Sequence, residues 1–310
     1  MTSVFRTIIA GYDGSEEGRD ALALAGFIAG ESAERVVAAT VAEATITSRL
    51  PGHAGGESAL VDAARKVAVR ASDEALVDPA ALEPTGLSAS SAAAGLHRLA
   101  ETLRADLVVA GSSHRGEIGR LLIGSTAARL LNGASCPVAA APRGFAKREH
   151  RVVRAVGLAY DGSHESRVAL EGAARLATEH DAAVRVFTVV PPSGPEGYDG
   201  PHVEVEDLRR DHYRAILDDA LKALPAEVRP EGRLLSGEVE EQLVEQANAS
   251  LDVMVVGSRA YGPVRRVLLG STSTALMRSA RCPVIVYPRG VEPDGGELAD
   301  AESAQPESQS

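Results

Sequence analysis

The chain has 310 residues, of which 45% are hydrophobic and 24% are charged, and its formal net charge is −11. This composition excludes disorder for the body of the chain, and the length predicts two folded domains. The acidic balance argues against general nucleic-acid binding, which requires basic surfaces that neutralise phosphates.

Strands and helices are expected to alternate along the first half of the chain. Apolar and β-branched runs predict five strands, at residues 4–12, 35–41, 85–91, 106–110 and 137–141. Apolar residues at helical spacing predict helices at residues 16–29, 58–77, 94–104 and 125–131. Residues 43–56, with Pro51 and three glycines, are expected to form a loop. This alternation is typical of a doubly wound α/β domain with a parallel sheet and right-handed crossovers.

The second half of the chain repeats the landmarks of the first. The run Tyr-Asp-Gly-Ser at residues 12–15 recurs letter for letter at residues 160–163, 148 positions later. The later landmarks recur 146 positions on, and the loop at residues 191–201 can account for the difference. We take the charged residues 145–151 as the linker. The sequence therefore predicts two domains, at residues 1–146 and 147–290, followed by a disordered acidic tail at residues 291–310.

The stretch from Gly111 to Thr126 combines spaced glycines with a predicted helix start. It follows the fourth strand, and it recurs as Gly257 to Thr272 with its first and last glycines at the same separation. Glycine lets backbone N–H groups approach an anion, and the helix start adds unpaired amides and the positive end of the helix dipole. Because ligands of open α/β sheets bind at the carboxyl ends of the strands, we expect this loop and the turn at Asp13 to converge on one site.

These landmarks resemble those of the universal stress protein family, in its tandem, two-domain form. The family's hallmark is Gly, two residues, Gly, nine residues, Gly and then Ser or Thr after strand four, with an Asp ending strand one. The resemblance covers about residues 4–290. It implies two adenine nucleotide alpha hydrolase-like, Rossmann-like domains, each with a five-stranded parallel sheet flanked by helices. It also implies an ATP-binding protein of the stress response, in which nucleotide occupancy modulates conformation or partner binding, and in which Mg²⁺ or Mn²⁺ accompanies the phosphates.

The resemblance also implies roles for individual residues of both halves. Asp13 and Asp161 would approach the ribose, and the main chain near Val41 and Val189 would lie beside the adenine. The phosphates would be held by the glycine-spaced loops and the helix starts, at Gly111, Gly124, Ser125, Thr126, Gly257, Gly270, Ser271 and Thr272. His114 and Ala260 stand where the hallmark has its middle glycine, and a Cβ there can obstruct a phosphate, although the His114 side chain could instead donate to one.

Simpler explanations of the same residues stay open. Residues 13–15 could form only a turn and a helix cap, and the loops could be structural, which would make the chain a nucleotide-free dimeric stress regulator that uses the fold as a scaffold. The chain has neither a Walker A run nor the Ser-Gly-Gly-x-Asp-Ser loop of related adenylating enzymes. We therefore assign no catalytic residue and expect slow ATP hydrolysis at most.

The remaining expectations concern the cysteines, the pairing of the halves and the location of the protein. Cys136 and Cys282 occupy equivalent places before a proline and are expected to be reduced core residues rather than a disulfide or a metal site. The halves are expected to pair through their fifth strands, at residues 137–141 and 283–287, and two chains could pair again as a homodimer. Neither a signal peptide nor a membrane anchor is evident, which predicts a cytoplasmic protein.

Overall fold

The structure is a computed structural model of the chain. It describes residues 4–30, 33–44, 54–74, 76–112, 124–148, 152–192, 202–258 and 270–288. We call residues 4–148 the first half and residues 152–288 the second half. The acidic tail, at residues 291–310, lies outside the described residues.

The first half alternates strands with helices, as expected. Its strands are β1 (Thr7–Gly11), β2 (Arg35–Glu43), β3 (Leu82–Ala89), β4 (Leu107–Gly111) and β5 (Val138–Ala141). Its α-helices are α1 (Glu16–Ala29), α2 (Ala54–Val69), α3 (Ala92–Leu103) and α4 (Ser125–Leu131), with short 3₁₀ helices η2 (Arg70–Glu74) and η3 (Phe145–Lys147). The order of elements is therefore that of a doubly wound α/β unit.

The second half follows the same order. Its strands are β6 (Ala155–Ala159), β7 (Ala183–Val190), β8 (Glu231–Ser236), β9 (Val253–Gly257) and β10 (Val284–Tyr287). Its helices are α5 (His164–Glu179), α6 (His202–Ala223), α7 (Val239–Ala249) and α8 (Ser271–Ser279), with the 3₁₀ helix η4 (Ala226–Val228). The internal repeat of the sequence is thus a repeat of structure.

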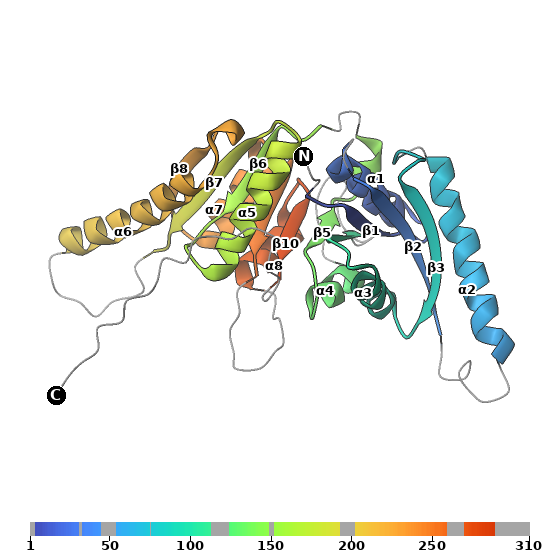
Figure 1. Cartoon of the computed structure of the whole chain (residues 1–310). Helices are drawn as coiled ribbons and strands as arrows, with labels where there is room; N and C mark the ends of the chain where they lie inside the picture. The colour runs from blue at the N-terminus through green and yellow to red at the C-terminus, as the bar shows by residue number, and fades with distance from the viewer. Residues whose placement is uncertain are drawn as a thin grey trace, which may run out of the picture.

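The described strands form one ten-stranded sheet in the order β3-β2-β1-β4-β5-β10-β9-β6-β7-β8. Pairing is parallel within each half, and the halves join where β5 and β10 pair antiparallel, with Ile285 opposite Ala139. This pairing of the fifth strands confirms the expected junction. Figure 1 shows the two halves side by side with β5 and β10 in the middle and with α2 and α6 at the outer ends.

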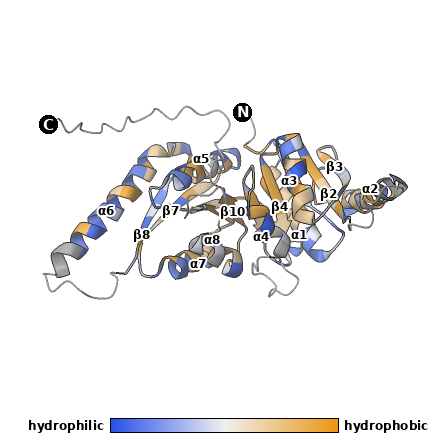
Figure 2. Cartoon of the chain, turned by 90° about the horizontal axis from the view of Figure 1, so that it is seen from below, coloured by the Kyte–Doolittle hydropathy of each residue, from blue (hydrophilic) through white to orange (hydrophobic). Residues whose placement is uncertain are grey.

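Helices cover both faces of this sheet. One buried apolar cluster lies between the sheet and α1, α5 and α6, and a second lies between the sheet and α3, α4, α7 and α8. Neighbouring residues of one strand alternate between the clusters: Ile8 belongs to the first and Ile9 to the second. The central strands are accordingly apolar on both faces, as the orange strands of Figure 2 show.

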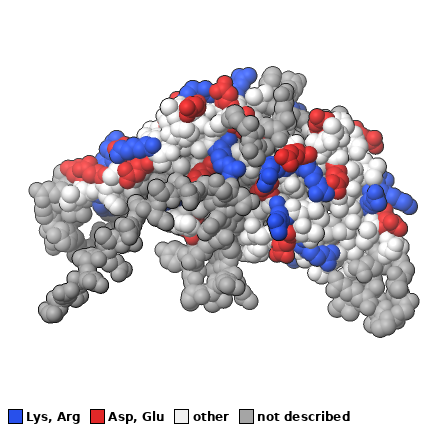
Figure 3. Space-filling view, in the orientation of Figure 1, with Lys and Arg blue, Asp and Glu red and all other residues white. Residues whose placement is uncertain are grey.

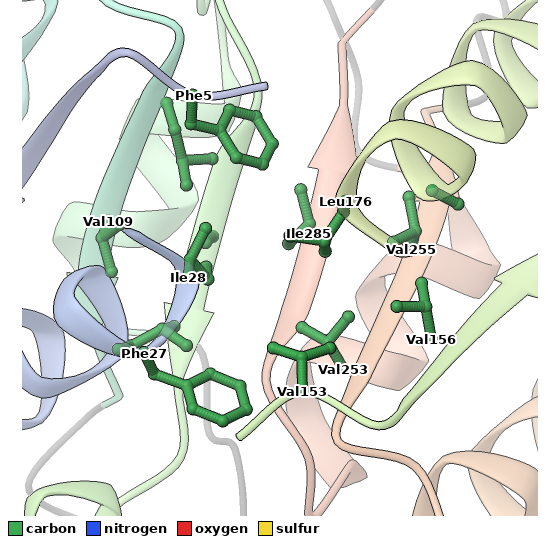
Figure 4. Packing of buried hydrophobic residues seen from close by; sticks show 14 of the residues in the cluster. Phe5, Phe27, Ile28, Val109, Val153, Val156, Leu176, Val253, Val255 and Ile285 are labelled. Atoms are coloured by element: carbon green, nitrogen blue, oxygen red, sulfur yellow. The ribbon is translucent and has the colours of Figure 1, made fainter. Parts of the chain in front are cut away.

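Apolar side chains from both halves also meet at the junction. In Figure 4, Phe27 and Ile28 of α1 approach it from one half, and Leu176 of α5 and Ile285 of β10 approach it from the other. The Nε2 of His180, which ends α5, lies 2.9 Å from the Ile28 carbonyl oxygen. His180 therefore links the two halves.

Several boundaries differ from the sequence-based expectations: the expected helix at residues 58–77, for example, is α2 to Val69 and then the 3₁₀ helix η2 to Glu74. The third strand begins at Leu82 and includes Pro84, which is tolerated because β3 is an edge strand and Pro84 needs no ladder partner on its open side. The segment between β2 and α2 is shorter at both ends than the expected loop at residues 43–56, because β2 runs to Glu43 and α2 starts at Ala54. The expected linker at residues 145–151 begins with η3, where the Phe145 ring is buried.

Candidate functional site

The turn after the first strand of each half is built from an aspartate and a serine. Asp13 Oδ1 accepts hydrogen bonds from the backbone N–H of Ser15, at 3.0 Å, and from the Ser15 hydroxyl. Ser15 Oγ in turn accepts from the N–H of Gly18, at 3.0 Å, and so caps α1. Gly14 between them has φ +80°, a backbone angle that favours glycine.

The second half repeats this turn. Asp161 Oδ1 accepts from the N–H of Ser163 at 3.1 Å and from its hydroxyl, and Ser163 Oγ accepts from the N–H of Ser166 at 3.2 Å. Each aspartate is therefore a structural acceptor of its turn as well as a carboxylate at the carboxyl end of a strand.

A threonine on the neighbouring strand fixes each turn to the sheet. The Thr40 hydroxyl donates to the Tyr12 carbonyl at 2.6 Å, and the Thr188 hydroxyl donates to the Tyr160 carbonyl at 3.0 Å. Both threonines are buried. Sequence reasoning missed them, although each lies one residue before Val41 or Val189, at the same place in both halves.

The glycine that ends the fourth strand of each half is required by packing. A Cβ on Gly111 would lie 2.1 Å from the backbone oxygen of Glu17, and one on Gly257 would lie 2.6 Å from the backbone oxygen of Glu165. Both positions therefore exclude every other residue unless the first turn of α1 or α5 moves. Glycine at these positions needs no phosphate to explain it.

The helices that follow the glycine-spaced loops start without a side-chain cap. Gly124 is the N-cap of α4 and Gly270 is the N-cap of α8, and neither makes a side-chain capping hydrogen bond. The first N–H groups of a helix have no partner within the helix, and the dipole favours an anion beside them. These helix starts can therefore receive a negatively charged group.

In each half a crevice brings these features together. The crevice of the first half is about 640 Å³ in volume, and five of the predicted residues line it: Asp13, Val41, Gly111, Gly124 and Thr126. The crevice of the second half is about 210 Å³, and its equivalent lining is Asp161, Val189, Gly257, Gly270 and Thr272. Ser271 does not line the crevice of the second half and is exposed. His114 and Ala260 lie outside the described residues, and nothing is described of the Ser125 side chain.

Two serines after the fourth strands were missed by the sequence analysis. Ser112 and Ser258 follow Gly111 and Gly257, line the crevices, and are only 3% and 1% exposed. Within the described part of the chain, Ser258 Oγ is buried without a hydrogen-bond partner. A buried hydroxyl without a partner is unfavourable, so a ligand atom that bonded to it would relieve this cost. The repeated Gly-Ser pair was the signal that could have found both residues.

A side-chain network joins Tyr12, which lines the first crevice, to Arg19 of α1 and Glu74 of η2. Glu74 Oε1 accepts from the Tyr12 hydroxyl at 3.0 Å and from Nε of Arg19 at 2.7 Å. Burial, together with the neighbouring Glu74 carboxylate, raises the pKa of Tyr12 to about 12. Tyr12 therefore stays a neutral donor, and it holds η2 against α1 beside the crevice.

The described residues show neither a metal cluster nor a spanning helix. Among them, no three His, Cys, Asp or Glu side chains gather to hold a metal ion. The helices in the described ranges include none that is long and apolar enough to cross a membrane.

Cys136 and Cys282 are free and buried, and burial raises the pKa of each thiol to about 12. In the described part of the face shown in Figure 3, acidic and basic side chains are interspersed.

Comparisons with known proteins agree with this architecture. A model of the universal stress protein family matches residues 5–142 and 153–288. A universal stress protein of Mycobacterium tuberculosis is 31% identical over 212 residues, which are 64% of this chain and 69% of that protein. A solved universal stress protein from Archaeoglobus fulgidus has a TM-score of 0.62 at 18% identity and covers 92% of this chain and 99% of its own. A protein from Pseudomonas aeruginosa has a TM-score of 0.61 at 18% identity, with 92% and 94% covered. Both solved structures share the fold.

Proposed function

The chain belongs to the universal stress protein family, and we propose that it binds ATP in the crevice of each half. Nucleotide occupancy would then modulate the conformation of the protein or its contacts with a protein partner. One observation carries the proposal: in both halves the aspartate turn, the main chain of the second strand and an uncapped helix start border the same crevice.

Each wall of the crevice suits one part of the nucleotide. Main chain near Val41 or Val189, on the second strand of its half, would lie beside the adenine. The N–H groups at the start of α4 or α8 would bind phosphate oxygens, and in the second half the Ser258 hydroxyl would donate to one as well. Asp13 and Asp161 lie in the turns that follow the strand between these walls and would accept hydrogen bonds from ribose hydroxyls. Mg²⁺ or Mn²⁺ bound with the phosphates is part of the same proposal.

Titration of the purified protein with ATP and Mg²⁺, followed by calorimetry, tests the proposal. We expect two sites in the unaltered chain and one in each of Asp13→Ala and Asp161→Ala, with affinity at the altered site lower by about tenfold or more. Asp218→Ala, which removes an exposed carboxylate of α6 outside both crevices, is the matched control and should keep two sites. Circular dichroism shows whether each variant remains folded.

A nucleotide-free regulator is the second candidate function, and two observations favour it. Gly111 and Gly257 are explained by helix packing, and Asp13 and Asp161 are explained by the turns that they hold. Heat denaturation of freshly purified protein distinguishes the candidates. Release of adenine nucleotide near one equivalent per crevice would exclude the regulator, whereas no release and no uptake of ATP would exclude the ATP-binding function.

A further inference from the structure

A second cavity lies beside the crevice of the second half, between α5 and α6. This cavity is about 780 Å³ in volume, and Leu170 and Ala174 of α5 and Ile216 of α6 give it an apolar surface. Four residues line both the crevice and this cavity, namely Tyr160, Asp161, His212 and Ile216. The α5–α6 groove, as we call this cavity, therefore opens directly beside the Asp161 turn.

The equivalent surface of the first half is covered. Arg19 of α1 is held by the Glu74 carboxylate, and a Cβ on Gly26 would lie 2.2 Å from the Leu76 carbonyl oxygen. The Phe27 ring packs against the Phe145 ring, with centroids 5.5 Å apart.

In α5 the three equivalent positions are Arg167, Ala174 and Arg175, and all three line the groove. The difference arises because η2 folds back against α1 after Val69, whereas α6 continues as a helix to Ala223. Among the residues that the structure describes, the second half therefore has a cavity where the first half has a filled contact.

The groove has the chemistry of a site for an aromatic or apolar group. Its surface combines the apolar side chains of Leu170 and Ile216 with the guanidinium groups of Arg167 and Arg175 at its edge. Burial against aliphatic side chains favours an apolar group, and a guanidinium can stack on the face of an aromatic ring. The carboxylates of Glu171 and Asp219 also border the groove, so its charge is mixed and a strongly anionic occupant is disfavoured.

The order of strands decides which part of a nucleotide reaches the groove. Strand β6, which leads into Asp161, lies between β9, which leads into Gly257, and β7, which carries Val189. A nucleotide with its base beside β7 and its phosphates beyond β9 has its sugar between them, because the sugar joins the two. The sugar would therefore lie at Asp161, where the groove opens.

From this geometry we infer that the site of the second half takes an adenine nucleotide whose ribose carries an aromatic or apolar group, and that this group lies in the α5–α6 groove. The inference rests on the ATP-binding function proposed above. The site of the first half takes the unextended nucleotide, because Glu74 and η2 close the corresponding space.

The probe is ATP that carries an N-methylanthraniloyl ring on its ribose, titrated by fluorescence beside unmodified ATP. In Asp13→Ala, in which only the second site is intact, we expect the modified nucleotide to bind about tenfold more tightly than ATP. In Asp161→Ala, in which only the first site is intact, we expect it to bind no more tightly than ATP. Adding Ala174→Phe to Asp13→Ala fills the groove and should remove the tenfold preference while leaving the affinity for ATP unchanged.

A second groove variant keeps the test decisive if Ala174→Phe does not fold. Ala223 is exposed on the α6 side of the groove, so Ala223→Phe should remove the preference with little effect on folding. Equal affinities for the two nucleotides at the second site, or a preference that survives both groove variants, would overturn the inference while ATP binding stands. If neither ATP nor the modified nucleotide binds at any site, the proposed function and the inference are overturned together.

Discussion

The two halves share a strand order and a crevice but differ in how the first helix of each is covered. Two residues of α1 have partners in the segments that cover this helix, namely Glu74 for Arg19 and Phe145 for Phe27. The equivalent positions of α5 line an open groove. The two halves thus keep the contacts that form the sheet and differ in the segments that cover the first helix of each half.

The halves also differ inside the core, but there the differences compensate. The first half has Leu24 on α1 and Ala141 on β5, whereas the second half has Gly172 and Tyr287 at the equivalent positions of α5 and β10. A Cβ on Gly172 would lie 1.9 Å from the Tyr287 hydroxyl oxygen. A large and a small residue have therefore exchanged sides of the same helix–strand contact, which preserves packing because cores tolerate swaps that conserve volume.

The largest expected effect comes from breaking this compensation. Gly172→Leu places a side chain where the Tyr287 ring lies, so we expect the free energy of unfolding to fall by about 3 kcal/mol or more. Combining it with Tyr287→Ala recreates the pair of the first half and should restore stability to within about 1.5 kcal/mol of the unaltered chain. Urea denaturation followed by circular dichroism measures both. A double variant no more stable than Gly172→Leu alone would show that the two positions do not compensate.

The next effect compares the two close-packed glycines. We expect Gly111→Ala and Gly257→Ala each to lower the free energy of unfolding by about 1–3 kcal/mol, with the larger loss for Gly111, whose added Cβ would lie nearer to the helix backbone. Gly11→Ala is the control, because the second half has Ala159 at the equivalent position and the nearest atom lies 3.2 Å away. Thermal unfolding without nucleotide measures the stability of these variants. Unchanged stability in both Gly111→Ala and Gly257→Ala would mean that packing does not require these glycines.

A smaller effect compares the two tyrosines that precede the aspartate turns. Tyr12→Phe removes a hydrogen bond to Glu74 and should cost about 1 kcal/mol of stability. Tyr160→Phe should cost less than about 0.5 kcal/mol, because Tyr160 lines the open groove and α6 places no equivalent of Glu74 against it among the described residues. Chemical denaturation measures the loss of stability in both variants. Equal losses would contradict the proposed difference between the surroundings of Tyr12 and those of Tyr160.

The repeat of the sequence predicted most of the fold because each landmark depends on local chemistry. Gly14 and Gly162 need positive φ, and Ser15 and Ser163 cap helices, so the letters of both turns recur with their geometry. The boundary at Pro84 could not be predicted locally, because its tolerance depends on β3 being an edge strand.

Crevice residues that repeat in both halves could be found from the sequence, although Thr40, Thr188, Ser112 and Ser258 were missed, whereas features of one half alone could not be found. The repeated letters pointed to the Asp turns and the glycine-spaced loops that border the crevices, whereas Val41 and Val189 came from the family resemblance. The Glu74 network and the α5–α6 groove depend on contacts between helices distant in sequence, and within the described ranges each is seen in one half. A comparison of repeats cannot find a feature that one repeat lacks.

The smallest expected effect depends on pH and concerns Asp20, where the second half has Val168. Asp20 is buried and accepts hydrogen bonds from the N–H groups of Gly144, at 2.7 Å, and Ala146, at 2.8 Å, which hold η3 on α1. Burial raises the pKa of the Asp20 carboxyl, and this outweighs the opposing effect of the two donors.

A carboxyl whose pKa is raised in the folded state retains its proton to higher pH there than in the unfolded chain. Its contribution to the free energy of unfolding is therefore complete below the unfolded pKa and is lost as pH rises through the folded pKa. Asp20→Asn removes this titration. We expect the stability of the unaltered chain minus that of Asp20→Asn to decrease as pH rises from the ordinary carboxyl range, measured by urea denaturation at successive pH values. A difference that stays constant or increases with pH would show that burial does not outweigh the two N–H donors, at Gly144 and Ala146, in setting the pKa of the Asp20 carboxyl.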